Sequence, residues 1–148
     1  MTEFLETTVD KFIFRVAADR FYNSEGVWAQ PDGRLVRIGL SDFLQQRSGD
    51  VAFAEVKPVG TEVAIGDEVA VIETIKVNIV LSSPVSGVVV EVNPEMEMSP
   101  EAINQDPYGK GWLAVIEASS WVTDLARLLD PPAYFAKMKV EAEEEAKK

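Results

Sequence analysis

Lys76 is the residue with the clearest chemical potential in this sequence. It lies in the segment Glu-Thr-Ile-Lys-Val-Asn at residues 73–78, between two runs of strand-forming residues. Gly66 precedes it and Gly87 follows it at nearly equal distances, which makes both glycines candidates for structural turns. A lysine raised at the end of a β-hairpin, in a chain with few other chemical groups, suggests a covalent attachment point. A turn over a packed sheet would expose the amine and also hold it in a fixed place.

The neighbours of this lysine are unusual for a turn. Ile75 and Val77 are apolar and β-branched where Gly, Asn or Asp would be usual. Either they pack against a nearby wall, or a partner recognises them. Together with Glu73 they form the predicted recognition site for a modifying ligase or partner. The alternative is that residues 68–82 form one long strand, with Lys76 on its solvent face.

The composition narrows the possible functions. The chain has 148 residues, 47% of them hydrophobic, with no Cys and no His. This removes the cysteine nucleophile, the disulfide, the usual zinc ligands and the imidazole base. We therefore expect no metal site and no catalysis by the chain itself. The formal net charge of −11 disfavours nucleic acid, which needs clustered Lys and Arg, and would steer an acidic carrier toward basic patches on partner proteins.

No segment of the sequence has the character of a signal peptide or a membrane span. The N-terminal residues are interrupted by charges at Glu3, Glu6 and Asp10. The most apolar stretch, residues 69–81, is broken by charged and amide side chains and cannot cross a bilayer. These features, with the missing cysteines, lead us to expect a cytoplasmic protein.

Short apolar runs separated by turn residues predict a mainly β fold. Strands are expected at residues 11–17, 26–30, 34–39, 51–56, 61–65, 68–75, 77–82, 87–92 and 112–118. Helices are expected at residues 41–47, from Ser99 onward, at 121–129 and at 132–146. Many short strands with only peripheral helices favour a flattened β-sandwich or barrel. We expect one domain over residues 1–148, with its core at about 11–118 and C-terminal helices at about 121–146.

Several of these segments resemble the lipoyl-carrying H protein of the glycine cleavage system. The pattern Gly-Asp-Glu-Val-Ala-Val-Ile-Glu-Thr-Ile-Lys at residues 66–76, followed by Ser-Pro-Val-Ser-Gly at 83–87, is similar to the region around that family's modified lysine. Residues 104–113 resemble its Asp-Pro-Tyr-Gly-x-Gly-Trp signature. Further similarity lies at residues 37–43, 49–55, 59–61 and 119–135. The resemblance covers roughly residues 21–136.

The resemblance implies a barrel-sandwich hybrid fold with lipoic acid in amide linkage to Lys76. The dithiolane would supply the sulfur chemistry that this cysteine-free chain lacks. A lipoate–protein ligase would attach it, and the chain would be a non-catalytic carrier. Because a carrier must dock with several enzymes in turn, we expect a monomer.

Two departures from the family pattern bear on what the arm carries. This chain has Gly26-Val27-Trp28 where the family usually has His-Glu-Trp, and Val80 where it usually has an acid four residues after the lysine. Those acids are thought to hold the amino group of the family's aminomethyl cargo, and burying an ammonium without an acceptor is costly. We therefore expect Val27, Trp28 and Val80 to line an uncharged resting cleft for the arm, although Glu25 could compensate.

An uncharged cleft favours a sulfur-oxidation branch of lipoate-binding proteins. In that branch a heterodisulfide-reductase-like complex is the partner and the arm transports sulfur. The alternative is glycine cleavage itself, with glycine decarboxylase, aminomethyltransferase and dihydrolipoamide dehydrogenase as partners. A lipoyl relay for other enzymes, an unmodified binding module that tolerates Lys76→Arg, and an enzyme built on carboxylates are the remaining alternatives.

Overall fold

The structure, a computed structural model, describes residues 2–148. Its strands are β1 (Phe4–Val9), β2 (Phe12–Ala17), β3 (Phe21–Tyr22), β4 (Val27–Asp32), β5 (Leu35–Leu40), β6 (Val51–Val56), β7 (Glu62–Val63), β8 (Glu68–Thr74), β9 (Asn78–Ser82), β10 (Gly87–Val92) and β11 (Ala114–Ala118). Its helices are α1 (Asp42–Ser48), α2 (Glu95–Met98), α3 (Ala102–Gln105), α4 (Trp121–Leu125) and α5 (Pro131–Ala146).

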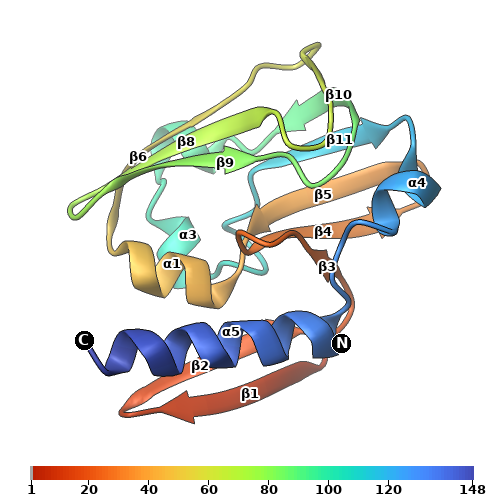
Figure 1. The fold of residues 1–148 in the computed structure, drawn as a ribbon. Helices are drawn as coiled ribbons and strands as arrows, with labels where there is room; N and C mark the ends of the chain where they lie inside the picture. The colour runs from red at the N-terminus through yellow and green to blue at the C-terminus, as the bar shows by residue number, and fades with distance from the viewer. Residues whose placement is uncertain (1) are drawn as a thin grey trace.

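Two antiparallel sheets form the sandwich (Figure 1). One has the strand order β3-β4-β5-β11-β10-β7, and the other has the order β6-β8-β9. Side chains from both sheets share one core, in which Ile38 of β5 and Ile116 of β11 meet Ile72 of β8 and Leu81 of β9. These four side chains are at most 2% exposed. The predicted mainly β sandwich with peripheral helices and a C-terminal helix is confirmed.

Helix α1 begins and ends where its capping residues predict. The Ser41 hydroxyl accepts a hydrogen bond from the Leu44 amide at 3.3 Å, which satisfies a donor at the helix N-terminus. At the other end Gly49 adopts a left-handed φ of 94°, which glycine tolerates without a steric penalty. The helix therefore stops where the chain turns into β6, beside the β8–β9 hairpin.

The sequence analysis missed β1, because it treated the N-terminal residues only as a charged segment. β1 pairs with β2 in a separate two-stranded sheet, and Figure 1 shows this hairpin lying along α5. Alternate residues of β1 are half-buried, as expected for a strand with one face against the protein. A two-stranded sheet is stable only when it packs on something else, and here α5 and α1 provide that surface.

An aromatic cluster joins the β1–β2 hairpin and α5 to the sandwich. Tyr22 and Tyr134 stack with their ring centroids 4.3 Å apart, and Phe14 packs edge-on against Phe43 at 5.4 Å. Burial raises the pKa of Tyr22 and Tyr134 far above the ordinary tyrosine value, and raises the pKa of Tyr108 to about 12. All three phenols are therefore neutral hydrogen-bonding groups at physiological pH.

Several predicted boundaries shift in the structure. The strand expected at 61–65 is only Glu62–Val63, because the Asp67 carboxylate accepts from the Ala64 amide and turns the chain there. β11 begins at Ala114, α4 ends at Leu125, and α3 begins at Ala102. Helix α2 was not predicted. Its first turn is supported by the Asn93 side chain, which accepts from the Glu95 amide at 3.0 Å.

Within residues 2–148 no helix is long and apolar enough to span a membrane. Over the same residues no group of three or more acidic, His or Cys side chains is arranged to hold a metal ion.

Candidate functional site

Lys76 lies at the tip of the hairpin formed by β8 and β9. β8 ends at Thr74 and β9 begins at Asn78, so the alternative of one continuous strand over residues 68–82 is wrong. The Thr74 amide donates to the Val77 carbonyl at 2.8 Å and closes the turn. The lysine therefore stands at a defined point of the backbone.

The Thr74 side chain organises this turn. Its hydroxyl oxygen accepts from the amides of Lys76 at 3.2 Å and Val77 at 3.0 Å. Its proton is directed at two carbonyls, those of Ser48 at 2.7 Å and Val77 at 2.9 Å. A single hydroxyl thus joins the hairpin tip to the end of α1, and this interaction was not anticipated from the sequence.

A second contact ties the tip to the strand that follows α1. The Ile75 amide donates to the Asp50 carbonyl at 3.0 Å. The Lys76 side chain runs beside Gly49, where an added Cβ would lie 2.9 Å from the lysine Cδ. The lysine Nζ donates to the Arg47 carbonyl at 3.2 Å. Lys76 is therefore exposed to solvent, and its amine lies against the last turn of α1.

The predicted recognition residues surround the lysine. Ile75 is 75% exposed and packs against no wall of the protein, whereas Val77 is 46% exposed and lines a groove beside the lysine. Glu73 is half-buried in β8, opposite Asn78 of β9 and Phe53 of β6. For Ile75, recognition by another protein is the option that remains, and for all three residues this role stays a prediction.

A groove of about 700 Å³ lies beside Lys76. Val80 lines it and is 57% exposed, as a wall residue should be. Val27 and Trp28 were predicted to line the same cleft, and this prediction is wrong because both side chains are fully buried. Neighbouring strand residues point to opposite faces, so Val27 of β4 enters the sandwich core and Trp28 enters the aromatic cluster.

The groove is not uncharged as predicted, because it contains the carboxylate of Glu25. Glu25 lies in the loop between β3 and β4 and lines the groove. One of its oxygens accepts from the Ser82 amide at 3.1 Å, and the other accepts from the Ser82 hydroxyl at 3.0 Å. Its place beside β9 could not be read from the sequence, because Glu25 and Ser82 are 57 residues apart.

A second carboxylate lines the groove from α5. Glu145 pairs with Arg47 of α1 at 3.1 Å, and both residues are partly exposed. The groove beside Lys76 is therefore mixed in character. Charged side chains line it together with apolar residues of the β8–β9 hairpin, namely Val77, Ile79, Val80 and Leu81. The sequence analysis missed Arg47 and Glu145, which only the packing of α5 brings to this place.

Gly26, which stands where the family usually has His, has a steric explanation. Its φ is 97°, and an added Cβ would lie 2.8 Å from the Tyr134 hydroxyl oxygen and 2.9 Å from that of Ser41. Those two hydroxyls also form a hydrogen bond of 2.8 Å with each other. A side chain at position 26 would therefore separate α5 from the start of α1.

The two glycines predicted as turns have different roles. Gly66 lies in the turn before β8 with a φ of 93° and open space around it. Gly87 is the first residue of β10 rather than part of the turn. A Cβ at Gly87 would collide with the carbonyl oxygen of Glu117 on the paired strand, so close approach of the two backbones explains this glycine.

Comparison with known protein families matches residues 20–144 to the model described as Glycine cleavage H-protein. The chain belongs to this family. Its relatives include the glycine cleavage system H proteins of Carboxydothermus hydrogenoformans and Thermus thermophilus. The former is 42% identical over 86% of this chain and 98% of its own length. The latter is 40% identical over the same shares of the two chains.

A solved structure agrees with this assignment. The crystal structure of a glycine cleavage system H protein from Mycobacterium marinum matches with a TM-score of 0.66 and 33% sequence identity. The match covers 69% of this chain and 85% of that chain. Glycine cleavage H proteins are non-catalytic carriers that hold lipoate covalently on a lysine. An exposed lysine at an anchored hairpin tip suits that attachment, since a ligase needs access and its partners need a fixed position.

Proposed function

We propose that Lys76 bears the lipoyl group and that the chain transports the aminomethyl group between glycine decarboxylase and aminomethyltransferase. A lipoate–protein ligase would load the lysine, and dihydrolipoamide dehydrogenase would reoxidise the arm. The observation that carries the proposal is the position of Lys76, at an exposed and hydrogen-bonded hairpin tip beside a groove that contains Glu25. When bound, the lipoyl group supplies the sulfur that carries the cargo.

Glu25 supports the choice of cargo. An aminomethyl group carries an amine that is protonated at neutral pH and needs an acceptor when it leaves water. The Glu25 carboxylate lies in the groove that begins at Lys76, held in position by two bonds from Ser82. It offers the acceptor that Val27 and Val80 cannot provide.

The mass of the protein from its native host tests the attachment. Intact mass and peptide mapping across residues 61–91 should locate one lipoyl increment on Lys76. The lipoylated protein should then accept an aminomethyl group from glycine decarboxylase in the presence of glycine. An unmodified Lys76, in cells that lipoylate other proteins, would contradict the proposal.

A Glu25→Gln variant tests the role of the groove. Loss of one charge-assisted contact corresponds to roughly a tenfold faster loss of the aminomethyl group to hydrolysis. Glu91→Gln, an exposed carboxylate of β10, is the matched control and should behave as the wild type. Equal hydrolysis rates in the two variants would remove Glu25 from the mechanism.

A second candidate cargo is sulfur, delivered to or from a heterodisulfide-reductase-like complex. The exposure of Val80 on the groove wall favours it, because an arm without an ammonium gains from an apolar surface there. In this case the lipoylated protein would not accept an aminomethyl group from glycine decarboxylase, and a sulfane sulfur adduct would be found on the protein from its native host. The decarboxylase assay above therefore separates the two cargoes.

A further inference from the structure

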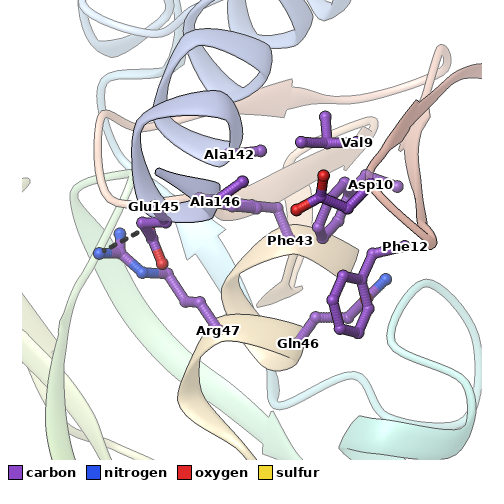
Figure 2. A pocket seen from close by; sticks show the side chains of 10 residues that line it. Val9, Asp10, Phe12, Phe43, Gln46, Arg47, Ala142, Glu145 and Ala146 are labelled. Carbon is purple, nitrogen blue, oxygen red and sulfur yellow. Dashed lines mark ion pairs between the residues drawn. The ribbon is translucent and has the colours of Figure 1, made fainter. Parts of the chain in front are cut away.

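A second cavity lies close to the groove and differs from it in character. It measures about 190 Å³ and is enclosed by the β1–β2 turn, α1 and the end of α5 (Figure 2). We call it the hairpin pocket. Its apolar lining consists of Val9, Phe12, Phe14, Phe43, Ala142 and Ala146. Asp10 and Gln46 are the other polar residues that line it besides Arg47 and Glu145.

The hairpin pocket and the groove share two lining residues. Arg47 and Glu145 contribute to both, and their ion pair of 3.1 Å stands between them. Figure 2 shows this pair at one side of the hairpin pocket. The Lys76 Nζ donates to the Arg47 carbonyl. The lysine side chain therefore ends at the residue that separates the two spaces.

The lining of the hairpin pocket suits an uncharged ring that contains sulfur. Phe12, Phe14 and Phe43 present aromatic faces and edges, and sulfur makes favourable contacts with aromatic rings. The groove also has apolar residues, but it places the charged groups of Glu25, Arg47 and Glu145 beside them and has no aromatic side chain. A lipoyl arm would start at the Lys76 Nζ, beside the Arg47 carbonyl. If it extends past the Arg47–Glu145 ion pair, burial of its apolar ring in the hairpin pocket is favourable.

We propose that the hairpin pocket is the resting site of the dithiolane ring of a lipoyl arm on Lys76. The proposal rests on the proposed lipoylation of Lys76 and goes beyond it. Part of the pocket belongs to segments outside the matched family range of residues 20–144, namely the β1–β2 hairpin and Ala146. The resting site thus depends in part on residues outside the range that matches the family.

Protection of the ring from reduction tests the proposal. The protein is lipoylated with a lipoate–protein ligase, treated with a water-soluble phosphine, and quenched at intervals for intact mass. Ala146→Trp places a large side chain at the exposed edge of the pocket and should displace the ring. Reduction of the dithiolane should be about five- to tenfold faster in Ala146→Trp than in the wild type, since the ring then stays in water.

Ala136→Trp is the matched control. Ala136 is exposed on the same helix and does not line the pocket, so this variant should be reduced at the wild-type rate. Equal rates in the wild type and Ala146→Trp would overturn the proposal. An increase in both variants would overturn it equally, because the effect would then not come from the pocket.

A second measurement needs no variant. Lipoylation should shift the ring proton resonances of Phe12 and Phe14 in the NMR spectrum, while those of Phe53, which is outside the pocket, should stay unchanged. Unshifted Phe12 and Phe14 resonances in a protein with lipoylated Lys76 would overturn the resting site and leave the proposed function standing. Failure of the ligase to modify Lys76 would overturn both.

Discussion

Two hairpins of this molecule each place a lysine at a tight turn, and their settings differ. Lys76 stands between β8 and β9, and Lys11 stands between β1 and β2. The β8–β9 hairpin belongs to a three-stranded sheet with β6 and shares the sandwich core. The β1–β2 hairpin is a sheet of its own that packs on α5 and α1.

The turns themselves are built in different ways. The Lys76 turn is fixed by the Thr74 hydroxyl to the end of α1 and is flanked by exposed Ile75 and Val77. The Lys11 turn depends on Asp10 in a left-handed conformation, with a φ of 56°. A lysine at a hairpin tip is therefore not a sufficient signal for a modification site. Both lysines have exposed apolar neighbours, and what distinguishes Lys76 is a turn that tertiary hydrogen bonds hold against the end of α1.

Replacing the two lysines gives the largest expected difference between the hairpins. Lys76→Arg should abolish the lipoyl increment completely, because the guanidinium cannot form the amide. Lys11→Arg should leave the increment unchanged. Intact mass after incubation with ligase, lipoate and ATP measures both. Residual lipoylation of Lys76→Arg would mean that the ligase uses another lysine.

Loosening the β1–β2 hairpin should cost stability without affecting the site. Phe14 is 7% exposed and contacts Phe43 of α1. Phe14→Ala should lower the free energy of unfolding by about 3 kcal/mol, as for other buried aromatic truncations. Urea unfolding measures this, and lipoylation of Lys76 should proceed at the wild-type rate. A variant with slow lipoylation would show that the two hairpins are coupled.

Loosening the β8–β9 turn should affect both stability and modification. Thr74→Val removes a hydroxyl that bonds the tip to Ser48 and leaves two amides of the turn without their acceptor. We expect a loss of about 1–2 kcal/mol in the free energy of unfolding and slower lipoylation in a ligase time course. Thr74→Ser keeps the hydroxyl and should restore the lipoylation rate. A Thr74→Val protein modified at the wild-type rate would contradict this role.

The Lys11 turn should respond to its backbone conformation alone. Asp10→Ala should lower the free energy of unfolding by about 1 kcal/mol, since alanine resists positive φ. Asp10→Gly should stay within a few tenths of a kcal/mol of the wild type, because glycine accepts that φ but also gains freedom in the unfolded chain. Thermal unfolding of the two variants distinguishes them, and equal melting temperatures would argue against strain at this position.

The smallest expected effect is a pH dependence at the base of the β1–β2 hairpin. Partial burial alone would raise the pKa of Asp19, but the hydrogen bond and charge of Arg20 lower it below the ordinary value of 3.8. A lowered pKa in the folded state stabilises the protein above the unfolded value, and this contribution is lost as the pH falls further.

A comparison with Asp19→Asn measures this contribution. The wild type should be slightly more stable than the variant at pH 7, and the difference should shrink as the pH falls from about 3.8 through the lowered pKa of the folded state. Because Asp19 is 38% exposed, solvent screening keeps the difference small. Urea unfolding at pH 7 and at pH 3 provides the test. A difference as large at pH 3 as at pH 7 would assign the effect to packing rather than charge.

Local patterns predicted the elements on which the site stands. The apolar runs and the glycine at position 66 placed the strands before and after Lys76, and Ser41 with Gly49 bounded α1. These signals work because turn, cap and strand preferences act over a few residues. β1 was not predicted because Glu6, Thr7 and Thr8 interrupt its apolar residues, and its half-buried face is covered only when α5 packs on it.

The sequence by itself determined the mainly β fold and the lysine at a hairpin tip, since both follow from short-range backbone chemistry. Only the tertiary structure decided the surroundings of that lysine. It buried Val27 and Trp28 on opposite faces of β4 and brought Glu25 to Ser82. It also paired Arg47 with Glu145 of α5. Such contacts join residues far apart in the chain, and only the packing of whole sheets and helices against one another fixes them.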